Sequence, residues 1–296
     1  MKISLALGGG GSKGAAHIGV LKVLERSGHK IKALAGTSIG GLIGAVYLAG
    51  NSPEYIESRF SESDFRDLFR RGNGSDNSLL GLKGVNNLLD EILADRVFSD
   101  LPIPFAVTSV DLISGRELIL NQGRLVDAIL AAIALPGIFP SRKWGDYLLV
   151  DGGLINPIPV SMARSLAPRV PVVAVALSRK PEANREIPKT NPLGAMPALD
   201  RISRFRLGQA FNVFTRSMSI SGRLLTELRL SIEKPEYLIR PEVDHVGLLD
   251  KVNVPEIVSL GEEAALNQFP ITSGSNWWLN RIARRLNPRN WVSKED

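Results

Sequence analysis

Short apolar runs alternate with segments of helical periodicity from the start of this chain. Residues 2–7 and 31–35 are apolar runs of strand length, and glycines connect each of them to a helix-patterned segment, over residues 15–27 and 39–49. Such alternation makes successive strands parallel, because each helix returns the chain across the sheet before the next strand begins. The pattern therefore predicts an α/β fold, with a mostly parallel central sheet and helices on both faces in three layers.

The rest of the chain continues this pattern. Strands are expected at residues 104–110, 116–120, 147–150, 170–177 and 237–240, and helices at residues 53–60, 85–94, 125–134, 159–167, 199–230 and 255–267. The longest helix is expected to break near Gly222, because glycine weakens a helix interior. No linker divides the chain, so residues 1–270 are predicted to form one domain and residues 271–296 a basic tail rich in Trp and Arg.

Composition excludes several classes of protein. Hydrophobic residues make up 44% and charged residues 22% of the chain, as in ordinary globular proteins, so disorder is not expected. The absence of cysteine excludes disulfides and thiolate chemistry and fits a reducing compartment. The first residues lack the long apolar core of a secretory signal, so a cytoplasmic location is expected. Residues 33–52 are uncharged, but their glycines fit a strand, a turn and a buried helix better than a membrane span.

A glycine-rich loop follows the first expected strand. Gly9, Gly10 and Gly11 precede Lys13 and Gly14 at the start of a helix, where backbone N–H groups can converge on a phosphate or an oxyanion. The spacing also fits a dinucleotide-binding loop, but the second strand does not end in the acidic residue that such a site needs. A triphosphate loop is disfavoured because Lys13 is followed by glycine.

A second motif lies between the second expected strand and its helix. Gly36 and Gly40 flank Ser38 in the pattern G-x-S-x-G, in which small neighbours let a strained turn raise the serine hydroxyl above the sheet. The start of the helix also favours negative charge on the serine oxygen. Ser38 is therefore the candidate nucleophile.

The base that would activate Ser38 is less obvious. The usual triad of this elbow places a histidine after the serine, and only His245 does so, in a polar segment. An alternative is Asp151, which follows an apolar strand and is followed by Gly152 and Gly153. A carboxylate at the end of a buried strand can reach the ligand crevice of an α/β sheet and accept a serine proton.

The three motifs in this order resemble the patatin-like phospholipase family, whose bacterial members use a Ser–Asp dyad. The resemblance extends over residues 134–140, 152–159, 239–241 and 247–250, and covers about residues 2–268. It implies that Ser38 is the nucleophile and Asp151 the base, and that an oxyanion hole is formed by Gly9, Gly10 and Gly11. Two residues depart from the family pattern: Lys13 stands where members often have arginine, and Ala132 where many have serine.

The resemblance implies a carboxylic ester hydrolase of the phospholipase A or lysophospholipase type (EC 3.1.1) that needs no cofactor and no metal. Its expected substrates are phospholipids or lysophospholipids, cleaved through an acyl-Ser38 intermediate. Two alternatives stay open, namely an α/β-hydrolase-type esterase that uses His245, and a non-catalytic lipid-binding or signalling protein on the same fold.

The tail suggests contact with a membrane. Within residues 276–291, apolar residues and arginines can lie on opposite sides of a helix, and tryptophans flank them. This combination suits an anionic bilayer surface. Peripheral contact at the inner membrane surface is therefore expected, and nucleic acid is not expected as a partner.

Overall fold

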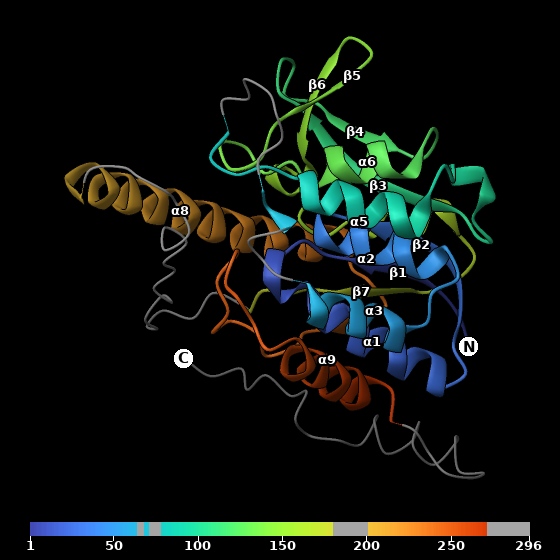
Figure 1. Ribbon diagram of the computed structural model, residues 1–296. Coiled ribbons are helices and arrows are strands. Elements are labelled where there is room, and N and C mark those ends of the chain that lie inside the picture. The colour runs from blue at the N-terminus through green and yellow to red at the C-terminus, as the bar shows by residue number, and fades with distance from the viewer. Residues whose placement is uncertain (64–67, 71–77, 180–200, 271–296) are drawn as a thin grey trace.

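The structure, a computed structural model, describes residues 1–63, 68–70, 78–179 and 201–270. A central sheet lies between two layers of helices, which confirms the predicted three-layer α/β fold (Figure 1). Within the described residues, no helix is both long and apolar enough to cross a bilayer.

The sheet has eight strands in the order β5-β6-β3-β2-β1-β7-β8, with β4 paired to β3. They are β1 (Lys2–Leu7), β2 (Lys30–Gly36), β3 (Phe105–Asp111), β4 (Glu117–Leu120), β5 (Arg142–Trp144), β6 (Tyr147–Asp151), β7 (Val172–Val175) and β8 (Tyr237–Ile239). The pairs from β3 through β2, β1 and β7 to β8 are parallel, as predicted. In contrast, β4 and β6 run antiparallel to β3, and the short strand β5, which was not predicted, pairs antiparallel with β6.

The α-helices divide into two unequal layers. They are α1 (Ala15–Arg26), α2 (Ile39–Leu48), α3 (Pro53–Glu62), α5 (Lys83–Leu93), α6 (Leu125–Ala132), α7 (Val160–Leu166), α8 (Arg201–Glu233) and α9 (Val254–Gln268). Helix α7 packs on β1, β2 and β7 and contacts α8, whereas α1, α2, α3, α5, α6 and α9 enclose the larger core on the opposite face.

Successive side chains of a strand point to opposite faces of the sheet, so each strand contributes residues to both hydrophobic cores. Ile3, Leu5 and Leu7 of β1 lie in the larger core, while Ala6 lies in the smaller core beneath α7. Ala35 of β2 occupies the equivalent position in the smaller core. The small side chains on that face allow α7 to approach the sheet closely.

The strands β2 and β6 meet end to end along one edge of β3. Phe105–Val107 of β3 pair with β2, and Ser109–Asp111 pair with β6. The carbonyl of Pro104 accepts from the amide of Leu34 in β2, and the amide of Leu112 donates to the carbonyl of Leu148 in β6. Because residues an even number apart point the same way, both partners lie on the same edge of β3. The carboxyl ends of β2 and β6 therefore converge on one point.

Helix α8 differs from its predicted form. It is continuous through Gly222, so the predicted break near this residue is wrong. The position of a Gly222 Cβ has no neighbour within 4 Å, so close packing does not explain the glycine. The helix extends beyond the sheet on one side (Figure 1).

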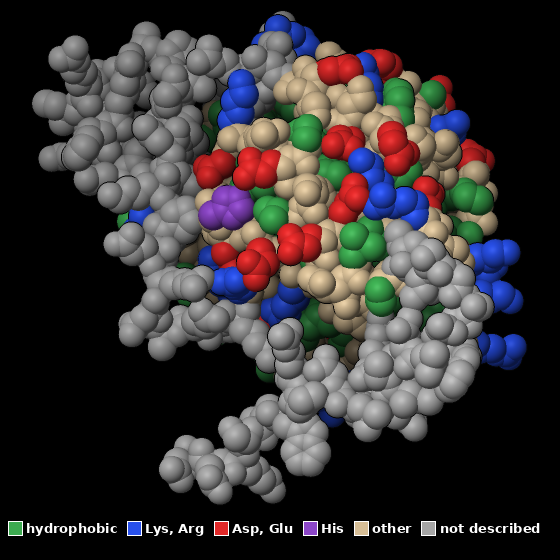
Figure 2. Space-filling view, turned by 90° about the horizontal axis from the view of Figure 1, so that it is seen from below, with side chains coloured by type: hydrophobic (Ala, Val, Ile, Leu, Met, Phe, Trp, Pro, Cys, Tyr) green, Lys and Arg blue, Asp and Glu red, His purple; other side chains and the backbone are tan. Residues whose placement is uncertain are grey.

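The predicted division into residues 1–270 and a tail stays a prediction, because residues 271–296 lie outside the described part of the chain. Figure 2 shows the face on which α9 lies, where acidic and basic side chains are interspersed over the described surface. The described part of this face therefore shows no single-sign surface that would favour one kind of charged partner.

Candidate active site

Ser38 forms a strained turn between β2 and α2. Its backbone has φ 52° and ψ −127°, a left-handed conformation that costs a residue with a side chain about 1–3 kcal/mol. A Cβ at Gly40 would lie 2.3 Å from the Leu7 carbonyl oxygen, and one at Gly36 would lie 2.3 Å from the Gly41 Cα. The two glycines are thus required by close approach of the backbone, which is the local reason for the G-x-S-x-G pattern.

Asp151 lies within hydrogen-bonding distance of Ser38. The Ser38 hydroxyl donates to Asp151 Oδ2 at 2.5 Å, and the Gly153 amide donates to Oδ1 at 2.8 Å. Asp151 is only 1% exposed. Burial raises the pKa of Asp151 to about 6, although hydrogen bonds from Ser38 and Gly153 oppose the shift. Above that pH the carboxylate can accept the serine proton.

Buried hydrogen bonds connect the turn that carries Ser38 to the loop that follows Asp151. Thr37 Oγ1 donates to the Asn156 carbonyl at 2.8 Å, and Thr108 Oγ1 donates to Thr37 Oγ1 at 3.3 Å. A Cβ at Gly152 would lie 2.0 Å from Thr108 Oγ1, so the aspartate loop rests directly on β3. These contacts fix the relative position of Ser38 and Asp151.

The glycine loop lies against Ser38, but its amides are not equivalent. The Gly9 amide donates to the Pro157 carbonyl at 2.9 Å, so this predicted oxyanion donor is engaged within the fold. The amides of Gly10 and Gly11 have no acceptor among the described residues. The amide of Ile39 has none either, at the position that directly follows the nucleophile in elbow enzymes. Ile39 was not among the predicted site residues, although the G-x-S-x-G pattern points to the residue after the serine.

Packing explains two of the other loop residues. Gly11 has φ 58°, and a Cβ there would lie 1.9 Å from the Leu248 carbonyl oxygen. A Cβ at Gly14 would lie 2.1 Å from Ile39 Cγ1, so the loop and the serine elbow pack without space for a side chain. Lys13 is largely buried beside Asp244, with 4.0 Å between Nζ and Oδ1. Burial lowers the pKa of Lys13, and the Asp244 charge opposes that shift.

The side chain of His17 contacts the backbone at the start of the glycine loop. The ring is fully buried, and its Nε2 lies 2.8 Å from the Gly8 carbonyl oxygen, so a neutral ring protonated at Nε2 donates to that carbonyl. Burial lowers the pKa of His17 to about 4, with the Gly8 bond opposing the shift. His17 therefore stays neutral at the pH where Asp151 is ionised.

The burial of neutral His17 predicts that the folded protein loses stability at acidic pH. The unfolded chain binds a proton at His17 below about pH 6.5, whereas the folded chain binds it only near pH 4, so stability falls as the pH falls through that range. The raised pKa of Asp151 acts in the opposite direction, so the Asp151→Asn protein isolates the effect. We expect its free energy of unfolding to fall by about 2–3 kcal/mol between pH 7 and pH 4 in urea titrations.

The matched control adds His17→Gln, which keeps a side-chain amide donor near Gly8 but cannot titrate. Between pH 7 and pH 4, the free energy of unfolding of the double variant should fall by about 2–3 kcal/mol less than that of Asp151→Asn alone. Equal slopes for the two proteins would contradict the assignment.

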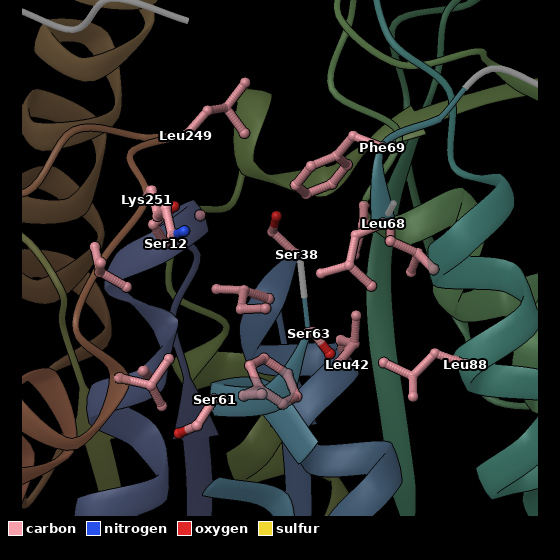
Figure 3. A pocket seen from close by; sticks show the side chains of 18 of the residues that line it. Ser12, Ser38, Leu42, Ser61, Ser63, Leu68, Phe69, Leu88, Leu249 and Lys251 are labelled. Atoms are coloured by element: carbon pink, nitrogen blue, oxygen red, sulfur yellow. The ribbon is translucent and has the colours of Figure 1, made fainter. Parts of the chain in front are cut away.

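Two cavities meet at Ser38. The larger, about 350 Å³, is mainly apolar and its described lining comes chiefly from α2, α5 and the segments around Phe69 and Val252. Figure 3 shows Ser38 within this cavity, with Leu42, Leu68 and Leu88 around it. The smaller, about 140 Å³, is lined by Ser38 and Asp151 together with residues of α8 and the segment before α9. Leu68 and Phe69, which belong to none of the helices and strands expected from the sequence, also line the larger cavity.

No histidine is among the described residues that line either cavity. His245 is exposed in the loop after β8, and its neighbours Asp244 and Val246 line the smaller cavity instead. The described residues also contain no group of three His, Cys, Asp or Glu side chains placed to hold a metal ion. The membrane-contact prediction for residues 276–291 falls outside the described part of the chain.

Comparison with known proteins gives consistent matches. A family model described as "Patatin-like phospholipase" matches residues 5–164. An uncharacterized NTE family protein of Mycobacterium tuberculosis is 33% identical over 163 residues, which are 54% of this chain and 45% of that protein. Patatin-like phospholipase domain-containing protein 7 of Rattus norvegicus is 26% identical over an alignment of 289 residues that covers 91% of this chain and 21% of the rat protein.

The chain therefore spans less than half the length of these curated relatives. Among solved structures, VipD from Legionella pneumophila superposes with a TM-score of 0.50 at 11% identity, over 90% of this chain and 66% of that one. This last match is a likeness of fold.

Proposed function

The chain belongs to the patatin-like phospholipase family, and we propose that it is a serine acyl-hydrolase that cleaves fatty-acyl esters of phospholipids or lysophospholipids. The observation that carries the proposal is the 2.5 Å hydrogen bond from the strained Ser38 to the buried Asp151, at the junction of two cavities. A nucleophile held against its base is the arrangement that acyl transfer requires.

The proposed reaction begins with acylation of Ser38. Ser38 Oγ attacks the ester carbonyl carbon while its proton passes to Asp151 Oδ2, and the carbonyl oxygen becomes an oxyanion. The unengaged amides of Gly10, Gly11 and Ile39 are the proposed oxyanion donors, and one such donor is typically worth about 10²–10³ in rate. The bond to the alcohol then breaks, and the alcohol leaves with the proton from Asp151.

Deacylation uses the same two residues. Asp151 takes a proton from an entering water molecule, whose oxygen attacks the acyl carbonyl carbon and forms a second oxyanion. When this intermediate collapses, Ser38 Oγ leaves the carbonyl carbon and regains a proton from Asp151. The free fatty acid is the product. No step of this scheme calls on a histidine, in contrast to the esterase alternative based on His245.

The larger cavity is proposed to hold the acyl chain. Its described lining is mostly Leu, Ile, Val and Phe, and its volume of about 350 Å³ falls in the range of small-ligand pockets. Helix α2 starts at the nucleophile and forms one wall of the cavity through Ile39, Leu42 and Val46. At 1.5 Å per residue, Val46 lies about 12 Å along the helix from Ser38. An extended acyl chain along this wall would pass Leu42 first and Val46 later.

This geometry predicts a chain-length effect. Val46→Phe should fill the far part of the cavity, and should reduce kcat/KM for palmitoyl esters at least about tenfold relative to butyryl esters. The measurement compares p-nitrophenyl esters of the two lengths with wild-type and variant protein. Val46→Ile adds one methylene group and serves as the matched control, with a smaller change in the ratio. An unchanged ratio in Val46→Phe would place the acyl chain elsewhere.

The proposed activity is tested by release of free fatty acid from lysophosphatidylcholine and from a p-nitrophenyl ester. Turnover of either substrate supports a hydrolase over the non-catalytic lipid-binding alternative. Binding of lipid without turnover of either substrate would favour that alternative.

We also propose that the protein acts in the cytoplasm, on lipids at the inner membrane surface. The basic and tryptophan-rich residues 276–291 support this proposal, as does the absence of cysteine. Co-sedimentation with anionic liposomes, compared between the full chain and a chain ending at Gly274, tests the membrane contact. Equal binding by the two chains would exclude the tail as the contact.

A further inference from the structure

Among the described lining residues, the smaller cavity shares only Ser38 and Leu135 with the larger, apolar cavity. It reaches the site through Gly9, Gly10, Ser38 and Asp151, and one wall is formed by Thr215, Ser219, Gly222 and Thr226 of α8. These four positions recur at helical spacing, so they present one face of α8 to the nucleophile. If the acyl part of an ester occupies the apolar cavity, the smaller cavity offers the space beside Ser38 for the alcohol part.

Three cations are among the described residues that line this cavity, namely Lys13, Arg216 and Arg223, together with two carboxylates, Asp151 and Asp244. Lys13 Nζ and an Arg223 guanidinium nitrogen lie 4.0 Å and 3.9 Å from the same oxygen of Asp244. Arg179, which is not among the lining residues, lies 3.5 Å from the other Asp244 oxygen and also pairs with Glu242 at 2.8 Å. Arg216 lines the cavity and has no ion pair with any described residue. The three cations of the described lining exceed its two carboxylates by one charge, even with Asp151 ionised, and this excess suits an anion.

The lining also bears on which anionic headgroup would fit. Two arginines can present several N–H donors to the oxygens of one phosphate, which is the geometry that favours arginine at phosphate sites. None of the described residues that line this cavity is aromatic, so a quaternary ammonium group would find no aromatic cage here.

We propose that this cavity is the subsite for the phosphate group of the leaving alcohol, bound by Arg216 and Arg223 of α8 with Lys13 behind them. The inference rests on the proposed hydrolase function and narrows its substrate to an anionic glycerophospholipid or lysophospholipid. Ser38 then lines both a cavity for the acyl chain and a cavity for the phosphate.

The experiment measures a ratio of specificities. The kcat/KM values for lysophosphatidic acid and for monoacylglycerol of the same chain length are compared below their aggregation concentrations. Each of Arg216→Gln and Arg223→Gln should lower the phosphate-to-neutral ratio about 10-fold or more, since a hydrogen bond to a charged group is lost. Arg169→Gln is the matched control, because Arg169 is exposed in the loop before β7, away from both cavities. Its ratio should equal that of wild type.

A second measurement separates this inference from the hydrolase proposal. Binding of intact lysophosphatidic acid to the Ser38→Ala protein is measured with and without Arg216→Gln, and inorganic phosphate is titrated as a competitor. At least about 10-fold weaker lipid binding in the double variant supports the subsite. Unchanged binding, or an unchanged ratio in both arginine variants, would overturn it, whereas failure of the wild type to cleave any ester would count against the hydrolase alone.

Discussion

Replacing Ser38 with alanine is expected to reduce ester hydrolysis by about 10⁴-fold or more, because the acyl group then has no oxygen to bond to. Removing the hydroxyl also leaves Asp151 Oδ2 without the hydrogen bond that Ser38 now supplies. Fatty-acid release from lysophosphatidylcholine and from p-nitrophenyl butyrate, normalised to folded protein, measures the loss. Retention of more than a few per cent of wild-type turnover would contradict the assignment of Ser38.

A second substitution at the same position separates catalysis from folding. Ser38→Gly should be as inactive as Ser38→Ala, but more stable, because glycine adopts φ 52° without the cost that a Cβ imposes. The difference in the free energy of unfolding should be about 1 kcal/mol or more in favour of glycine. Two inactive variants with this order of stability would exclude unfolding as the cause of lost activity.

Asp151→Asn is expected to lower kcat about 10³-fold or more, because the amide cannot take the Ser38 proton. In the wild type, kcat/KM should fall as the pH falls through about 6, where Asp151 becomes protonated. A pH–rate profile of wild type from pH 4.5 to 9 measures this dependence. A profile unchanged by Asp151→Asn would exclude Asp151 as the base.

The same substitution should change stability with a defined sign. The folded pKa of Asp151 is raised to about 6 from an ordinary value near 3.8, so the folded state binds more protons than the unfolded state between those values. Wild-type stability from this group is therefore present at low pH and is lost as the pH rises through about 6. Asp151→Asn removes a buried charge, and should raise the free energy of unfolding at pH 8 relative to wild type.

The positions of the two residues of the proposed dyad, Ser38 and Asp151, differ in how well the sequence could predict them. The position of Ser38 follows from local information, because the small glycines and the strand–turn–helix pattern are adjacent in the chain. The position of Asp151 beside Ser38 does not follow from local information. The sequence predicts only that a buried strand ends at Asp151 in a mostly parallel sheet, whereas β6 runs antiparallel to β3 and meets β2 end to end. Strand direction depends on pairing between residues distant in sequence, which periodicity does not encode.

Other features also depended on long-range packing. The engagement of the Gly9 amide follows from the carbonyl of Pro157, which only the folded chain brings near. The cationic cavity requires α8 to lie beside the glycine loop, and nothing near Arg216 or Arg223 in the sequence indicates that contact. The strong hydrophobic periodicity did locate the strands and helices of both faces, because burial of one face acts on neighbouring residues.

The most direct test of the proposed dyad is covalent labelling with a fluorophosphonate that carries a long alkyl chain, followed by mass spectrometry of the peptides. Such a reagent reacts with a serine whose oxygen is activated by a neighbouring base. The dyad predicts one adduct on Ser38, lost in Ser38→Ala, strongly slowed in Asp151→Asn and formed at the wild-type rate in His245→Ala. An adduct on another residue, or a Ser38 adduct that requires His245 and not Asp151, would contradict it.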